Sequence, residues 1–184
     1  YYNKPTQAGI FQHYKVIANS TNLPIIIYNV PGRTSSNISS QTTLELASSI
    51  TNIVGVKEAS GDLEQIMNII LKKPENFLVI SGDDALTLPH ICVGGDGVIS
   101  VIANAFPKRF STMVHAALNN NLSLANEKHY ELFEIIHYLF KDGNPAGIKH
   151  VLKLINICSD NVRLPLVSIT KKTADKLYEL VASI

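Results

Sequence analysis

Residues 53–60 read Ile-Val-Gly-Val-Lys-Glu-Ala-Ser, and the rest of the sequence is organised around this stretch. Its first four residues are β-branched apart from one glycine, which predicts a short strand buried in a sheet. Lys57 stands at the carboxyl end of that strand. Desolvation by apolar neighbours favours the neutral amine, which is a nucleophile toward carbonyl carbon. The plainer interpretation is a surface lysine at the point where the strand emerges.

Short apolar segments alternate with helical patterns on both sides of this strand. Strands are predicted at 24–30, 53–58, 77–81 and 97–101, and helices at about 6–20, 40–49, 62–73 and 84–93. Such alternation indicates an α/β fold in which right-handed βαβ units build a parallel sheet.

From Pro107 onward the pattern is helical only. Helices are predicted at about 107–120, 123–140, 145–155 and 170–182, with an extended segment at 164–166 before the last one, which Thr170 is expected to cap. Apolar stripes on these helices predict that they pack against other elements. The sequence therefore predicts two domains, with the strands in 1–106 and a helical domain in 107–184.

The composition argues against several classes of protein. Lysine and arginine number 16 against 15 acidic residues, and a net charge of +1 gives no basis for binding nucleic acid or an anionic membrane. No apolar run is as long as a membrane span, and no signal peptide is visible. Cys92 and Cys158 are the only cysteines, which favours a reducing, cytoplasmic location. The histidines show no ligand spacing, so neither a metal nor a cofactor is expected.

Functional side chains of parallel α/β sheets gather at the carboxyl ends of the strands. Strict alternation points Ile53, Gly55 and Lys57 to one face of their strand. If Tyr28 on the preceding strand faces the same way, a phenol meets the amine and could carry protons during imine formation. Gly55 is expected to leave room for the lysine stem. The alternative for Tyr28 is a core aromatic with a satisfied hydroxyl.

Two further polar motifs follow strands, and a third precedes one. Arg33, on a tight turn past the first strand, could bind a substrate carboxylate in bidentate fashion, or it is an ordinary exposed arginine. Asp83 and Asp84 could suggest a metal, but a helix N-cap explains them better. The glycine-rich segment 94–97 lies between a helix and a strand, which is the reverse of a phosphate-binding loop.

Five motifs stand out in combination. They are Tyr1-Tyr-Asn-Lys-Pro5, Tyr28-Asn-Val-Pro-Gly-Arg-Thr34, Gly55-Val-Lys-Glu-Ala-Ser-Gly61, Ser81-Gly-Asp-Asp84 and Gly94-Gly-Asp-Gly-Val-Ile-Ser100. Together they resemble the dihydrodipicolinate synthase family, which belongs to the pyruvate-dependent class I aldolases that include N-acetylneuraminate lyase. The resemblance implies the C-terminal half of an eight-stranded (β/α) TIM barrel, followed by a helical domain.

The resemblance also implies an activity and its catalytic residues. The implied reaction is the Schiff-base condensation of pyruvate with L-aspartate 4-semialdehyde to 4-hydroxy-tetrahydrodipicolinate, in lysine and diaminopimelate biosynthesis, with no cofactor. Lys57 would form the Schiff base and Tyr28 would relay protons. Tyr2 would be a second relay tyrosine that reaches across a tight dimer into the partner's site, within a tetramer built as a dimer of dimers.

Binding residues are implied in the same way. Arg33 would bind the carboxylate of the semialdehyde, and the backbone near Ile99 and Gly82 would lie close to pyruvate. Tyr1 matches a position that lines the lysine-inhibition site of feedback-regulated members. The presence of Arg33 favours the synthase over the sialic-acid lyase.

The sequence begins where the fourth strand of such a barrel would end, so the first half, with its double-threonine motif, is expected to be missing. Four parallel strands cannot close a barrel. Three interpretations therefore stay open at this point. The chain is part of an active synthase, part of a related aldolase that acts on a sugar acid, or a catalytically silent half-barrel that only associates with partners.

Overall fold

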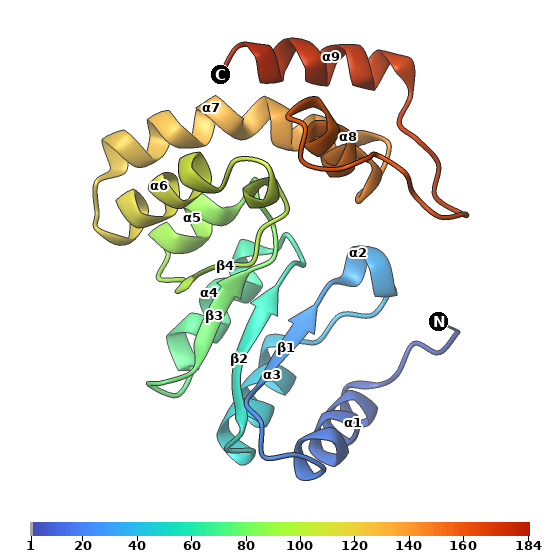
Figure 1. Cartoon of the computed structure of the whole chain (residues 1–184). Helices are drawn as coiled ribbons and strands as arrows, with labels where there is room; N and C mark the ends of the chain where they lie inside the picture. Colours follow the sequence, from blue (N-terminus) through green and yellow to red (C-terminus); the bar gives the residue numbers. More distant parts are fainter. Residues whose placement is uncertain (1) are drawn as a thin grey trace. The chain divides into compact units, whose positions relative to one another are not determined.

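The computed structural model describes residues 2–184, and it shows an α/β protein with four parallel strands (Figure 1). The described residues form two compact units, of which one ends at Ile99 and the other spans Ser100–Ile184. The α/β class predicted from the alternating pattern is confirmed. The assignment of 1–106 and 107–184 as separate domains stays a prediction.

The strands pair in chain order, and each neighbouring pair is parallel. They are β1 (Ile25–Asn29), β2 (Ile53–Glu58), β3 (Leu78–Ser81) and β4 (Gly97–Val98). The helices of the same unit are α1 (Gln7–Asn19), α2 (Pro31–Thr34), α3 (Ser40–Ser49), α4 (Leu63–Lys72) and α5 (Thr87–Cys92). One or two helices thus separate each strand from the next, as the βαβ pattern requires.

The core of this unit lies on one face of the sheet. Ile27, Val56 and Val79, one from each of the three longer strands, are fully buried. They belong to an apolar cluster with residues of α1, α3 and α4, namely Ile10, Ala18, Leu46, Ile66 and Ile69. Burial of these side chains is what holds the three helices against the sheet.

The pairing of β1 with β2 contains one irregularity. Ile25 pairs with Ile53, but Ile26 pairs with Gly55, so one residue of β2 is passed over. Such a bulge breaks strict alternation at that point. Ile53 is consequently buried in the helix-covered core, and the prediction that it shares the face of Lys57 is wrong.

The fourth strand is shorter than predicted. Only Gly97 and Val98 pair, opposite Ile80 and Ser81, and the backbone N–H of Ile99 donates to the carbonyl of Ser81 at 3.0 Å. Because β3 ends at Ser81, the segment beyond Ile99 has no strand to pair with on that side.

The second unit is helical. Its elements are the 3₁₀ helix η1 (Ile102–Asn104), α6 (Pro107–Leu118), α7 (Leu122–Lys141), α8 (Ala146–Leu154) and α9 (Lys171–Ala182). Buried side chains on the inner stripes of the four α-helices include Met113, Leu132, Leu139, Val151 and Leu177. Within residues 2–184, no helix combines the length and the apolar composition that crossing a membrane requires.

The start of α9 is fixed by a cap that the sequence predicted. The Thr170 side chain accepts a hydrogen bond from the backbone N–H of Thr173. The backbone N–H and the hydroxyl of Thr170 both donate to the Asp142 carboxylate at 2.8 Å. These bonds, chiefly the one from the Thr170 backbone, hold the pKa of Asp142 below its ordinary value.

Replacement of the cap tests this junction. We expect Thr170→Ala to lower the free energy of unfolding by about 1 kcal/mol, because an N-cap hydroxyl is lost. Urea denaturation monitored by circular dichroism measures the change. In the folded protein the pKa of Asp142 lies below its ordinary value, so the contribution of this carboxylate to folding stability is complete above the ordinary aspartate pKa. That contribution is lost as the pH falls through the folded pKa. Ser168→Ala, in the exposed segment just before the cap, is the control and should leave stability unchanged.

Candidate active site

The carboxyl ends of β1 and β2 bring a phenol and an amine together. Tyr28 and Lys57 are directly opposite in the parallel register, and Lys57 Nζ lies 4.2 Å from the centroid of the Tyr28 ring. This geometry is a cation–π contact, so the amine lies over the ring face. Tyr28 is 44% exposed, and Lys57 is half-buried. Both side chains project from the sheet face opposite the helix-covered core, where solvent can reach them.

Gly82, just past β3, accommodates the lysine stem. A Cβ atom added at Gly82 would lie 3.1 Å from Cε and 3.2 Å from Cγ of Lys57, and 2.8 Å from Cβ of Ala59. A Cβ atom added at Gly55 would instead lie 2.8 Å from the carbonyl oxygen of Leu78. The expectation that Gly55 makes room for the lysine is therefore wrong. Gly55 allows β3 to approach β2, and Gly82 provides the space beside the amine.

A buried polar pair lies next to the Tyr28–Lys57 pair, on the opposite face of the sheet. Asn29 and Glu58 are each 1% exposed and are directly opposite in the register. Asn29 Nδ2 donates to both carboxylate oxygens of Glu58 at 3.0 Å. Neither Asn29 nor Glu58 was predicted from the sequence as a residue of the site. The signal was available, because alternation turns the neighbours of Tyr28 and Lys57 toward the helices, where a polar residue needs a partner.

Arg33 lies on α2, a single helical turn directly after β1. Its guanidinium is exposed and forms no ion pair within the described part of the chain. Arg33 and Tyr28 both line a cavity of about 740 Å³, together with Asn3, His13 and Tyr14. A free guanidinium beside a phenol suits an anionic ligand that carries a carboxylate.

Tyr14, on α1, contributes a second phenol to this cavity. Burial raises the pKa of Tyr14, and a hydrogen bond with the backbone of Tyr28 opposes the rise. The group therefore stays protonated near neutral pH.

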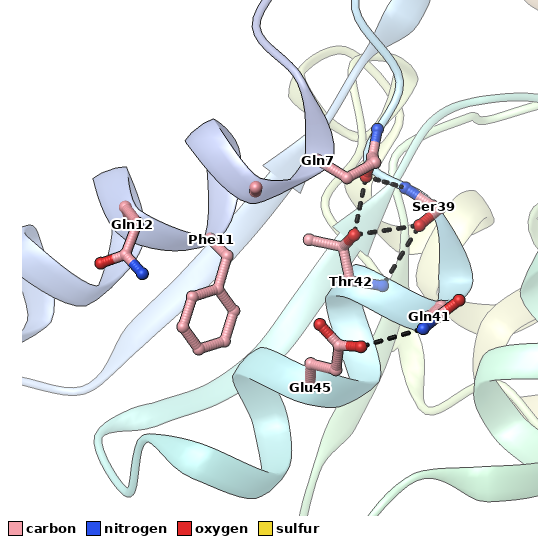
Figure 2. A pocket seen from close by; sticks show the side chains of 8 residues that line it. Gln7, Phe11, Gln12, Ser39, Gln41, Thr42 and Glu45 are labelled. Atoms are coloured by element: carbon pink, nitrogen blue, oxygen red, sulfur yellow. Dashed lines mark hydrogen bonds between the residues drawn. The ribbon is translucent and has the colours of Figure 1, made fainter.

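A smaller hollow of about 330 Å³ lies between α1 and α3 (Figure 2). Gln7 Oε1 accepts hydrogen bonds from the Thr42 hydroxyl at 2.8 Å and from the Ser39 backbone at 3.0 Å. Gln41 donates to Glu45 at 3.0 Å on the same wall. These bonds join the two helices to each other, so the hollow is a helix–helix seam.

The other residues proposed for the site are exposed or lie outside the described part of the chain. Tyr2 is 95% exposed in the segment before α1, and Tyr1 lies outside the described residues. Ile99 is 47% exposed, just after β4. Asp83 Oδ1 accepts hydrogen bonds from the backbone N–H groups of Ala85 at 2.9 Å and of Leu86 at 3.1 Å, in the turn before α5. The N-cap of α5 is Leu86 and has no side-chain cap, so the helix-cap role predicted for Asp83 is wrong. Among residues 2–184, no cluster of side chains could hold a metal ion.

Comparisons with known proteins agree on one protein family. The profile of the dihydrodipicolinate synthetase family matches residues 1–184. The 4-hydroxy-tetrahydrodipicolinate synthase of Flavobacterium psychrophilum is 49% identical over 177 residues, which cover 96% of this chain and 60% of the relative. The corresponding protein of Phocaeicola vulgatus is 50% identical over 181 residues, covering 98% and 61%.

A solved structure of dihydrodipicolinate synthase from Aquifex aeolicus superposes with a TM-score of 0.96 at 40% identity, covering 100% of this chain and 62% of that one. The chain thus spans about 60% of the length of the curated relatives that it matches. The similarity extends over both compact units.

Substitution of Gly82 tests the packing beside the lysine. We expect Gly82→Ala to cost about 1–3 kcal/mol of stability, because the added methyl overlaps Ala59 and Lys57. It should also displace the amine from the Tyr28 ring. Two-dimensional NMR reports this as loss of the ring-current shift of the Lys57 ε-protons. Gly32→Ala is the matched control, since a Cβ atom there meets nothing within 4 Å. If the Lys57 ε-proton signal of Gly82→Ala stays at its wild-type position, Gly82 is not the residue that leaves space for the lysine.

Proposed function

The chain belongs to the dihydrodipicolinate synthetase family, and from this we propose that it carries the imine-forming site of a 4-hydroxy-tetrahydrodipicolinate synthase. The reaction is the condensation of pyruvate with L-aspartate 4-semialdehyde in lysine and diaminopimelate biosynthesis. The observation that carries the proposal is the Tyr28–Lys57 pair at the carboxyl ends of two adjacent parallel strands. An amine beside a phenol at that end of a sheet is suited to imine chemistry.

In the proposed mechanism, the neutral amine of Lys57 attacks the keto carbon of pyruvate and a carbon–nitrogen bond forms. Tyr28 donates a proton to the carbonyl oxygen and then assists its departure as water, which leaves the imine. Loss of a methyl proton converts the imine into an enamine, whose carbon attacks the aldehyde carbon of the semialdehyde. The amino group of the semialdehyde then attacks the imine carbon, closes the ring and releases the amine of Lys57.

The remaining roles complete the proposal. Arg33 binds the carboxylate of the semialdehyde, which is supported by its free guanidinium in the cavity that Tyr28 also lines. The backbone at Gly82 and Ile99 faces pyruvate. Tyr2 acts in the site of a partner subunit within a cytoplasmic homotetramer, and its 95% exposure in this chain leaves it available for such a contact.

Trapping the imine tests the assignment of Lys57. We expect the protein incubated with pyruvate and borohydride to gain one reduced adduct, mapped to Lys57 by peptide mass spectrometry. Lys57→Ala should abolish the adduct, whereas Lys15→Ala, on the exposed side of α1, should keep it. Retention of an adduct on another lysine in Lys57→Ala would refute the proposal.

Substitution of Arg33 tests the second substrate. We expect Arg33→Ala to raise KM for the semialdehyde by roughly 10- to 100-fold, because a charged hydrogen-bonding contact of about 1.5–3 kcal/mol is lost. The rate of adduct formation with pyruvate alone should stay as in the wild type. Steady-state kinetics and borohydride trapping separate the two effects. A wild-type KM for the semialdehyde, with turnover of sugar-acid aldehydes, would instead indicate a related aldolase.

A further inference from the structure

Glu58 carries a carboxylate that is buried without a counter-ion. It is 1% exposed and forms no ion pair within residues 2–184. Burying an isolated carboxylate is costly unless hydrogen-bond donors replace its water. Here the donors are Asn29 Nδ2 to both oxygens at 3.0 Å, the Ser60 backbone N–H at 2.8 Å and Gln65 Nε2 at 3.0 Å. The carboxylate is therefore the acceptor at the centre of a set of fixed donors.

These donors come from three different places in the fold. Asn29 is the last residue of β1, Ser60 follows β2, and Gln65 lies in the first turn of α4. Glu58 itself is the last residue of β2. One side chain thus ties together the ends of two strands and the start of the following helix.

Asn29 extends the network to the segment that carries Arg33. Its Oδ1 accepts from the Ile38 backbone N–H at 3.0 Å, and its Nδ2 donates to Asn37 Oδ1 at 2.8 Å. Asn37 Nδ2 in turn donates to Gln65 Oε1 at 2.8 Å. The far end of segment 30–39 is therefore anchored to the Glu58 network, while its near end continues from β1.

The register connects this network to the reactive pair. Asn29 pairs with Glu58 in the step immediately after Tyr28 pairs with Lys57. Neighbouring residues of a strand point to opposite faces, so a strand end that is anchored on one face cannot rotate on the other.

From these contacts we infer that Glu58 is a positioning residue, which holds Lys57 against Tyr28 and holds the Arg33 segment in place. The inference rests on the proposed function of Lys57 for its kinetic readout.

The donor set specifies a carboxylate at this position. In Glu58→Gln, the new amide NH₂ group faces Asn29 Nδ2 or Gln65 Nε2. Because these nitrogens are donors themselves, one buried hydrogen bond is lost. The double variant Glu58→Gln with Gln65→Glu restores a donor–acceptor pair, because the amide at 58 can now donate to a carboxylate at 65. This exchange keeps the charge and the atoms but moves the carboxylate, so it separates network geometry from charge at position 58.

The experiment measures the rate of the borohydride-trapped pyruvate adduct on Lys57 in the full-length protein, with kcat and KM for each substrate. We expect Glu58→Gln to slow adduct formation at saturating pyruvate by roughly 10- to 100-fold, the effect of misplacing a reacting group. The Lys57 ε-proton ring-current shift should shrink, and the Ile38 amide should exchange faster with deuterium. The double exchange should return all three readouts to within about threefold of wild type.

Leu46→Ala serves as the matched control for stability. It opens a cavity in the core at a fully buried position of α3 that lies outside the network. We expect a lower unfolding temperature with wild-type adduct rate and Lys57 shift. A rate loss in this variant equal to that in Glu58→Gln would overturn the inference, since Glu58 would then act through stability alone.

Two results in the network variants would also overturn it. One is a folded Glu58→Gln with the wild-type adduct rate, and the other is a folded double exchange that stays as slow as the single variant. If Glu58→Gln does not fold, Gln65→Ala removes one donor at a half-buried position, and a wild-type rate there counts against the inference. Failure of the wild type to form any adduct would refute the proposed function instead, while the NMR shift and amide exchange still decide the positioning role.

Discussion

The parallel register of β1 with β2 is the constraint on which the rest of the site depends. It pairs Tyr28 with Lys57 and then Asn29 with Glu58, on opposite faces of the same sheet. A slip of one residue would turn the amine toward the helices and the carboxylate toward solvent. The buried hydrogen bonds to Glu58 oppose such a slip, because each would be broken without water to replace it.

The two faces of the sheet accordingly have different tasks. The face toward α1, α3 and α4 is filled by apolar side chains, with the Asn29–Glu58 pair at its carboxyl edge. The other face presents Tyr28 and Lys57 to solvent, and Gly82 leaves the space that the lysine occupies. The buried core and the candidate site thus lie on opposite faces of one sheet, and the alternation of side chains along each strand couples them.

Local pattern was enough to predict the strands and the longer helices, and it left the Tyr28–Lys57 pair as a conditional expectation. Apolar runs rich in β-branched residues marked β1, β2 and β3, and the cap at Thr170 marked the start of α9. Period-two alternation allowed Tyr28 and Lys57 to meet if both side chains faced the same way, and the strand register brings them together. The face of Ile53 and the length of β4 did not follow, because a passed-over residue and the end of a neighbouring strand are properties of pairing between segments.

The sequence by itself determined the α/β class, the order of strands and helices, and the lysine at a strand end, because each depends on residue types within a few positions of one another. Tertiary structure alone decided which glycine makes room for Lys57. Gly55 packs against Leu78, whereas Gly82, at the end of the neighbouring strand β3, lies beside the lysine side chain. Tertiary structure likewise decided that Glu58 is held by Asn29, Ser60 and Gln65. The bonds of Glu58 to Ser60 and Gln65 are local, but its bond to Asn29 and the packing of Gly82 against Lys57 join different strands. Steric fit and hydrogen-bond geometry between strands exist only once the strands are packed.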